Sequence, residues 1–346
     1  MTEILVDLYS DTVTRPTAAM RRAIAEADVG DEQNREDPTV NRLQEQVAEL
    51  LGTEAALFLP SGTMCNQIAF AVHCRPGDEI LLHELAHPLL YEAGGPAALV
   101  GAIMRPLPGA RGLYTAEQVR QAVRPRVHYM PRTRVLSVEQ TANIVGGVCW
   151  PLAQIQEVCA AGHAAGLACH MDGARLMNAV VASGTPARAF ARPFDSVWLD
   201  LTKGLGAPVG ALLAGSRAFI EEAWVFKQRF GGAMRQAGII AAAGIHALDH
   251  HVDRLAEDHE RARLLARGLA ELPGLAVDAD RVETNIVIFD VRGTGLTGEE
   301  FGRRTQRFGV RFSVLGPTLV RAVFHLDVPA DGVERALSAA RAALRG

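Results

Sequence analysis

The sequence of 346 residues has few cysteines, no long apolar run and no excess of basic residues. Its five cysteines are scattered and none forms a Cys-x-x-Cys pair, which argues against a disulfide framework or a zinc ribbon and favours buried thiols. The N-terminus lacks the basic start and apolar core of a signal peptide, and the apolar stretch at residues 237–248 is too short to span a bilayer. We therefore expect a soluble, cytoplasmic protein with no membrane partner.

The charge balance is slightly acidic. The chain has 35 Lys+Arg residues against 39 Asp+Glu residues, a formal net charge of −4 at pH 7. A protein that neutralises phosphate backbones would carry a basic excess, so nucleic acid is not an expected partner. Hydrophobic residues make up 49% of the chain and charged residues 21%, which is typical of a globular protein with a large core rather than a disordered chain.

Short apolar segments alternate with helical patterns through much of the chain. The predicted strands are residues 55–59, 79–82, 134–138, 167–171, 196–199 and 210–214. Helices are predicted over residues 40–52, 64–74 and 152–165. Strands that alternate with helices favour right-handed βαβ units, and hence an α/β fold around a mostly parallel sheet.

The pattern changes after a long helical stretch at residues 236–272. Further strands are predicted at residues 285–291 and 319–324, and a final helix at residues 331–344. We therefore divide the chain into three parts. These are an N-terminal segment (residues 1–39), a large domain (residues 40–250) and a smaller C-terminal α/β domain (residues 251–346).

Two polar segments follow predicted strands. Asp172 opens an Asp-Gly-Ala-Arg run, and Lys203 lies in a glycine-rich loop after the next strand. Alone, an Asp-Gly would be a helix cap and a Lys-Gly a surface turn. However, open α/β sheets build their sites at the carboxyl ends of strands. One βα unit apart, the pair favours pyridoxal phosphate (PLP), because the lysine amine can form a Schiff base while the carboxylate keeps the pyridine nitrogen protonated.

Two further segments fit a phosphate-bearing, planar cofactor. Ser61, Gly62 and Thr63 follow a predicted strand and open a helix, where backbone N–H groups bind anions and a hydroxyl also caps the helix. Taken alone, the two interpretations are equally supported, and the presence of the Asp172–Lys203 pair favours the phosphate. His87 follows the next strand; it could stack on a cofactor or move a proton, although a single histidine is more often structural.

Other patterns give weaker support to a site. The Gly-x-Gly-x-x-Gly run at residues 293–298 lies late in the chain, and no acidic residue ends a second strand about 20 residues later, which disfavours a nicotinamide dehydrogenase. Four histidines lack the carboxylates of a specific metal site, so we expect a solvated helix and no metal. They are His246, His250, His251 and His259. A non-catalytic binding protein fits poorly with lysine, aspartate and arginine residues placed at loop ends.

Together these segments resemble the low-specificity threonine aldolase family of fold-type I PLP enzymes, within the β-eliminating lyase and threonine aldolase superfamily. The matching segments are residues 7–16, 37–40, 61–63, 86–87, 92–95, 172–175, 203–206, 234–236 and 321–328. The resemblance implies an aspartate-aminotransferase-like large domain with a mostly parallel, seven-stranded sheet. It also implies that the N-terminal segment contributes to the active site, and that the chain forms at least a dimer, commonly a homotetramer.

The resemblance implies residue roles around PLP. Lys203 would form the Schiff base, Asp172 would pair with the pyridinium nitrogen and His87 would stack on the ring, so these are the expected catalytic residues. Gly62 and Thr63 would hold the phosphate. The other expected cofactor-binding residues are Ser61, Arg175 and Arg235, the last of which is a candidate to complete the active site of a neighbouring subunit.

The implied substrate is a small amino acid. Ser10, Arg175 and Arg321 would bind its carboxylate, and bidentate arginine–carboxylate geometry suits that role. The implied reaction is retro-aldol cleavage of a β-hydroxy-α-amino acid to glycine and an aldehyde, in glycine and amino-acid metabolism. The alternative is a PLP-dependent β-eliminating lyase, or a related PLP enzyme, with an altered pocket for the β-substituent.

The chain departs from the family pattern in the region that reads the β-substituent. The family usually has Arg where this chain has Tyr9, Tyr-Gly where it has Asn34 and Arg35, and His where it has Ala142. That histidine is associated with the substrate's β-hydroxyl group. We therefore hypothesise that the substrate is not plain threonine, or that His87 or a water molecule replaces the missing base.

Overall fold

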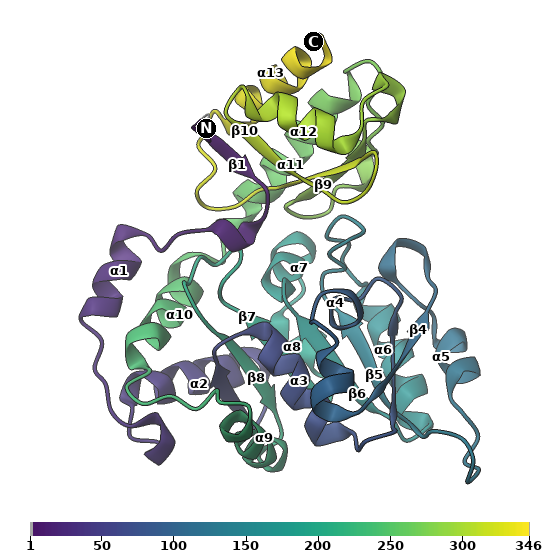
Figure 1. The fold of residues 1–346 in the computed structure, drawn as a ribbon. Coiled ribbons are helices and arrows are strands. Elements are labelled where there is room, and N and C mark those ends of the chain that lie inside the picture. The colour runs from purple at the N-terminus through teal and green to yellow at the C-terminus, as the bar shows by residue number, and fades with distance from the viewer. Residues whose placement is uncertain (1–2, 346) are drawn as a thin grey trace.

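The computed structural model describes residues 3–345 and contains two β-sheets surrounded by helices (Figure 1). The larger sheet consists of β2 (Ala55–Leu59), β3 (Glu79–His83), β4 (Ile103–Leu107), β5 (Thr133–Glu139), β6 (Ala168–Gly173), β7 (Ser196–Asp200) and β8 (Ala211–Gly215). Its seven strands follow the order β2-β8-β7-β6-β5-β3-β4. Strand β8 is antiparallel to both of its neighbours, and all other pairs are parallel. The predicted α/β fold with a seven-stranded, mostly parallel sheet is confirmed.

Helices cover both faces of the larger sheet. One face packs against α2 (Pro38–Leu51), α5 (Ala116–Ala122), α6 (Leu152–Ala164) and α8 (Ala187–Ala191), and the other against α3 (Gly62–His73) and α9 (Arg217–Arg229). The strands therefore carry apolar side chains on both sides. In β2, Ala56 and Phe58 face the first group of helices, whereas Leu57 and Leu59 face the second. This explains why the strands appear in the sequence as continuous apolar runs.

The smaller sheet joins the two ends of the chain. Its strands are β1 (Val6–Leu8), β9 (Ile286–Asp290), β10 (Val310–Val314) and β11 (Leu319–Val323), in the order β1-β10-β11-β9. Strand β1, purple in Figure 1, lies parallel to β10 near the other end of the chain. The helices α11 (Leu255–Ala270), α12 (Gly298–Gln306) and α13 (Gly332–Arg345) complete the core around this sheet. The N-terminal segment consequently passes from the small sheet toward the large one.

The helix predicted over residues 236–272 is interrupted. Helix α10 (Gly238–His250) ends before a turn at residues 251–254, and α11 follows. The prediction that four histidines lie on a solvated helix is also wrong for two of them, because His251 and His259 are buried. His251 Nδ1 lies 2.7 Å from the carbonyl oxygen of Leu205, and Asn178 Nδ2 donates to His259 Nε2 at 3.1 Å. These contacts fasten the turn and α11 to the large sheet's loops and helices.

The cysteines behave largely as predicted. Cys65, Cys74, Cys159 and Cys169 are buried, Cys149 is partly buried, and none is in a disulfide in the described chain. Across residues 3–345, no helix is long and apolar enough to cross a membrane.

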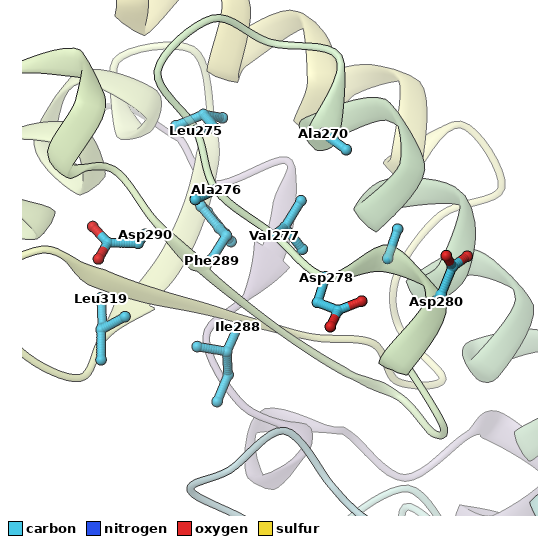
Figure 2. A pocket seen from close by; sticks show the side chains of 11 residues that line it. Ala270, Leu275, Ala276, Val277, Asp278, Asp280, Ile288, Phe289, Asp290 and Leu319 are labelled. Atoms are coloured by element: carbon cyan, nitrogen blue, oxygen red, sulfur yellow. The ribbon is translucent and has the colours of Figure 1, made fainter.

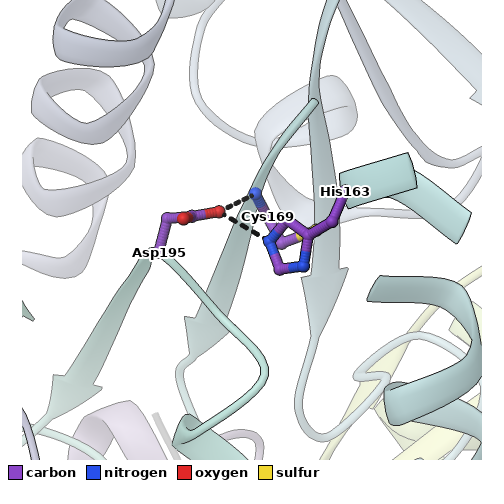
Figure 3. A group of neighbouring side chains, drawn as sticks. All are labelled: His163, Cys169 and Asp195. Atoms are coloured by element: carbon purple, nitrogen blue, oxygen red, sulfur yellow. Dashed lines mark hydrogen bonds and ion pairs between the residues drawn. The ribbon is translucent and has the colours of Figure 1, made fainter. Parts of the chain in front are cut away.

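His163, Cys169 and Asp195 form a cluster at the starts of β6 and β7 (Figure 3). Their potential metal-ligating atoms lie within 4.8 Å of one another. Asp195 Oδ2 accepts the backbone N–H of Cys169 at 2.7 Å and lies 2.9 Å from His163 Nε2. The carboxylate thus ties the end of α6 to the starts of both strands, and these bonds explain the cluster without an ion.

A substitution at Gly173, the last residue of β6, tests how closely this strand packs against β7. A Cβ atom at this position would lie 1.9 Å from the carbonyl oxygen of Trp198 on the neighbouring strand β7. We expect Gly173→Ala to lower the stability of the fold by about 1–3 kcal/mol, because one of the two strands must move. The matched control is Gly316→Ala, where a Cβ atom would meet nothing within 4 Å. Thermal unfolding midpoints measure both, and equal midpoints would contradict this account of the packing.

Candidate active site

One hollow, of about 730 Å³, lies where β3 and β5 begin, and its lining includes Asp78, Arg132 and Arg134. Two further hollows of similar size lie elsewhere in the described chain. One, of about 700 Å³, lies on the small sheet (Figure 2) and combines apolar side chains with Asp278, Asp280 and Asp290, without any lysine, arginine or histidine in its lining. The other, of about 810 Å³, lies at the carboxyl ends of the parallel strands and contains acidic and basic side chains together. Clefts in open α/β sheets bind ligands at such strand ends. The hollow of about 810 Å³, hereafter the cleft, is the one at these strand ends and is therefore the candidate active site.

The cleft brings together nearly all of the predicted site residues. Strand β6 ends with Asp172 and Gly173, Lys203 follows the end of β7, and His87 opens the short helix α4 (His87–Leu90) after β3. Ser61 precedes α3 at the end of β2. The predicted residues in the cleft lining are Ser10, Ser61, Gly62, Thr63, His87, Asp172, Arg175, Lys203 and Arg321.

Lys203 is one of only two lysines in the sequence. Its ammonium group pairs with Asp200, which ends β7, and lies 5.7 Å from the centroid of the Trp198 ring. The other lysine, Lys227, is fully buried and pairs with Glu32. Lys203 is thus the one lysine amine that faces the cleft, its side chain 19% exposed. The scarcity of lysine is visible in the sequence and is a further signal that singles out this residue.

Asp172 is a buried acceptor on the cleft wall. Its Oδ2 accepts Asn66 Nδ2 at 2.9 Å, and its Oδ1 accepts the backbone N–H of Ala174 at 3.1 Å. Burial raises the pKa of Asp172 above 3.8, and Glu92 adds to the rise, while His87, Asn66 and Lys203 act against it. A buried carboxylate in this position is stabilised by a cationic N–H donor, which a protonated pyridine nitrogen would offer.

His87 is held by a buried carboxylate. Its Nδ1 lies 3.0 Å from Glu92 Oε1, and its ring is 37% exposed on the cleft side. Burial acts to lower the pKa of His87, but the hydrogen bond to Glu92 and the nearby acidic groups together raise it above 6.5. The imidazole therefore keeps its proton to a higher pH than an unperturbed histidine, and the contact with Glu92 fixes its orientation.

The start of α3 is compatible with both roles expected from the sequence, a helix cap and an anion-binding helix N-terminus. Ser61 Oγ accepts the backbone N–H of Met64 at 3.2 Å, so the serine does cap the helix. Gly62 lies against the Trp198 ring, and a Cβ atom there would be 2.2 Å from Trp198 Cη2. Only glycine therefore allows this close approach. The N-terminus of this 12-residue helix borders the cleft and can accept an anion such as a phosphate.

The predicted substrate-binding residues differ in whether their side chains already pair with a carboxylate of the protein. Arg175 Nε and Nη2 each donate to Asp11 at 2.7 Å, and Asn285 also donates to that carboxylate, at 3.1 Å. Burial acts to raise the pKa of Asp11, but Arg175 outweighs it and the pKa falls to about 2. Ser10 Oγ accepts the backbone N–H of Thr12 at 3.2 Å. Arg175 is thus a neutralised cation.

Arg321 contacts neutral side-chain oxygens and pairs with no carboxylate among the described residues. Its Nε donates to Ser313 Oγ at 3.0 Å and its Nη1 to Asn143 Oδ1 at 3.1 Å. Within residues 3–345 its guanidinium has no carboxylate within 4.0 Å, whereas Arg175, Lys203 and His87 each have one. Burial lowers the pKa of Arg321, and Arg175 adds to this. An anionic group of a substrate would relieve that unpaired charge.

Arg235 lies outside the cleft lining. Its Nη1 pairs with Asp31 Oδ2 at 2.8 Å, and its side chain is 63% exposed. Its action on a neighbouring subunit stays a prediction. The residues that sequence reasoning gave no role are the acidic, amide and aromatic partners Asp11, Asn66, Glu92, Glu139, Asn143, Trp198 and Asp200. Asp11 and Glu92 lie in the matching segments, but the side chain that each of these residues contacts is not visible in the sequence.

Ala142 lines a small cavity beside the cleft. The cavity shares Glu139 and Asn143 with the cleft and also contains His83. Both ring nitrogens of His83 contact backbone: Nε2 lies 3.0 Å from the carbonyl oxygen of Gly109, and Nδ1 accepts the N–H of Leu85 at 3.0 Å. His83 is therefore engaged in the protein and does not replace a histidine at position 142.

Comparison with known proteins connects this geometry to a family. The family described as β-eliminating lyase matches residues 7–293. The low specificity L-threonine aldolase of Escherichia coli K12 is 42% identical over 329 residues, which cover 94% of this chain and 95% of the relative. Low-specificity L-threonine aldolase 1 of Arabidopsis thaliana is 39% identical over 338 residues, 96% of this chain and 94% of the relative.

Solved structures agree in fold. The threonine aldolase of Leishmania major gives a TM-score of 0.84 at 18% identity and covers 98% of this chain and 99% of its own. A structure titled as a putative L-allo-threonine aldolase from Listeria monocytogenes gives 0.81 at 20% identity and covers 99% of this chain and 97% of its own. The expected fold type I architecture is confirmed. With a family match over most of its length and relatives near 40% identity across almost all of it, the chain belongs to the β-eliminating lyase family that includes the low-specificity threonine aldolases.

Proposed function

We propose that this chain is a PLP-dependent carbon–carbon lyase that cleaves a β-hydroxy-α-amino acid such as threonine or allo-threonine to glycine and an aldehyde. One observation carries the proposal: the cleft joins an accessible lysine amine to a buried aspartate and an arginine without a carboxylate partner. The relatives named low-specificity L-threonine aldolases support the same reaction.

The residues of the cleft fit PLP. Lys203 offers an amine for the cofactor's aldehyde, and Asp172 is a buried acceptor for a protonated ring nitrogen. The start of α3, where a Cβ atom at Gly62 would strike Trp198, would hold the phosphate. His87 would lie against the ring, with Glu92 fixing its orientation.

When bound, PLP withdraws electrons from the substrate's Cα, so that the bond from Cα to Cβ can break. The protein's own groups position the substrate for this. Arg321 binds the carboxylate, and Arg175, paired with Asp11, shapes the same wall without adding net charge. His87, which lines the cleft, would hold or return a proton. These preset charges favour the reacting geometry without reorganisation.

β-Elimination is the second candidate, because the matching family is described as β-eliminating lyase and Ala142 stands where the aldolases usually have histidine. Product analysis separates the two reactions: glycine and an aldehyde support the aldolase, whereas pyruvate and ammonia support elimination.

We also propose that the chain forms a homo-oligomer, a dimer or tetramer, in which the exposed Arg235 reaches the cleft of a neighbouring subunit.

Lys203→Ala tests the function directly. The variant should lose the visible absorbance of bound PLP and fall by ~10³-fold or more in cleavage rate, because the amine that fixes the cofactor is gone. Absorbance spectra and aldehyde release measure the two effects. Wild-type protein that stays colourless after PLP addition, or a variant with wild-type activity, would contradict the proposal.

Glu92→Gln tests the proton held by His87. Without the carboxylate 3.0 Å from Nδ1, the charged imidazole loses its main stabilising partner, so the pKa of His87 should fall. The group would then lose its proton at lower pH, seen in the pH profile of kcat/KM and in histidine NMR titration. Glu84→Gln, an exposed neighbour, is the control. An unchanged titration in Glu92→Gln would refute this role for Glu92.

Ala142→His tests the altered pocket. Restoring the family's histidine should raise kcat/KM for threonine, because a base would again reach the β-hydroxyl group. The variant must retain bound PLP, since position 142 is buried and a Cβ atom on the neighbouring Gly112 would already lie 2.7 Å from Ala142 Cβ. If parent and variant both cleave threonine with the same ordinary efficiency, the hypothesis of an altered pocket is wrong.

A further inference from the structure

Arg321 is oriented by two neutral oxygens. Ser313 Oγ accepts its Nε and Asn143 Oδ1 accepts its Nη1. Arginine only donates, so the atom of the Asn143 amide that faces it must be the oxygen. Unlike a carboxylate, this oxygen fixes the guanidinium without cancelling its charge. The cation is therefore held in place and still needs an anion.

Asn143 is itself held by a buried carboxylate. Its backbone N–H donates to Glu139 Oε1 at 3.1 Å, and the other oxygen, Oε2, accepts the backbone N–H of His87 at 3.0 Å. Glu139 ends β5 and is nearly fully buried. One carboxylate thus links the segment that contacts Arg321 to the segment that carries His87.

The link also joins the two sheets. Arg321 belongs to β11 of the small sheet, whereas Asn143 follows β5 of the large sheet. The hydrogen bond between them spans residues 178 positions apart in sequence. A change at Asn143 should therefore move the guanidinium relative to Lys203 and Asp172, which line the cleft from the large sheet.

We propose that Asn143 is a positioning residue for recognition of the substrate carboxylate, and that Glu139 fixes Asn143 relative to His87. The uncharged acceptor at position 143 makes Arg321 a receptor for an α-carboxylate at a set distance from the reacting centre. This inference rests on the proposed function and adds the residue that orients its carboxylate-binding arginine.

The test compares Asn143→Asp with Asn143→Ala in the holoenzyme. Aspartate has almost the size of asparagine but would pair with Arg321 and compete with the substrate, so KM for threonine and the Kd for glycine should rise at least ~10-fold, with a smaller change in kcat. Alanine loses the orientation but leaves the charge, so its increase should be smaller. A purely structural role predicts the opposite order, because aspartate preserves the side-chain volume.

Asn41→Asp, on α2 away from the cleft lining, is the matched control. Glycine binding is read from the absorbance of the bound PLP. If the wild type binds glycine and Asn143→Asp binds it equally well, or better than Asn143→Ala does, the inference is overturned while the proposed function stands. If the wild type binds PLP but its spectrum responds neither to glycine nor to threonine, the proposed function itself fails.

Discussion

The site depends on one constraint: strands that run parallel in one sheet all end at the same edge. β3, β5, β6 and β7 end at this edge, and β2 does too, because both β2 and β7 are antiparallel to β8. Residues separated by more than a hundred positions, such as His87 and Lys203, therefore line one cleft. The sheet is buried on both faces, so it holds these side chains on a rigid base.

Charge pairing within the cleft then determines what it can recognise. Burying a cation is costly unless an anion lies beside it. Asp11, Asp200 and Glu92 provide such partners for Arg175, Lys203 and His87. In the described chain Arg321 meets only neutral acceptors there. The cleft consequently contains one cation whose charge a substrate can balance, at the border between the two sheets.

Local patterns in the sequence predict the sheet and the two central site residues. Apolar runs mark most strands of the large sheet, and polar residues after them mark Asp172 and Lys203. Non-local features are different. The three-residue strand β1 pairs with β10 about 300 residues away, and Asp11 meets Arg175 at a separation of 164 positions. No short-range pattern in the sequence indicates such contacts.

The break between α10 and α11 is not predicted for a different reason. The turn at residues 251–254 contains neither glycine nor proline, so the helical spacing of apolar residues gives no sign that the helix ends there.

We propose that the Lys203 amine carries the cofactor, and because the sequence has only two lysines, this attachment is easy to test. Borohydride reduction of the PLP-loaded protein, followed by peptide mass mapping, should place a pyridoxyl group on the peptide with Lys203 and none on the peptide with Lys227, the buried internal reference. An adduct on Lys227, or no adduct on either peptide, would contradict the account.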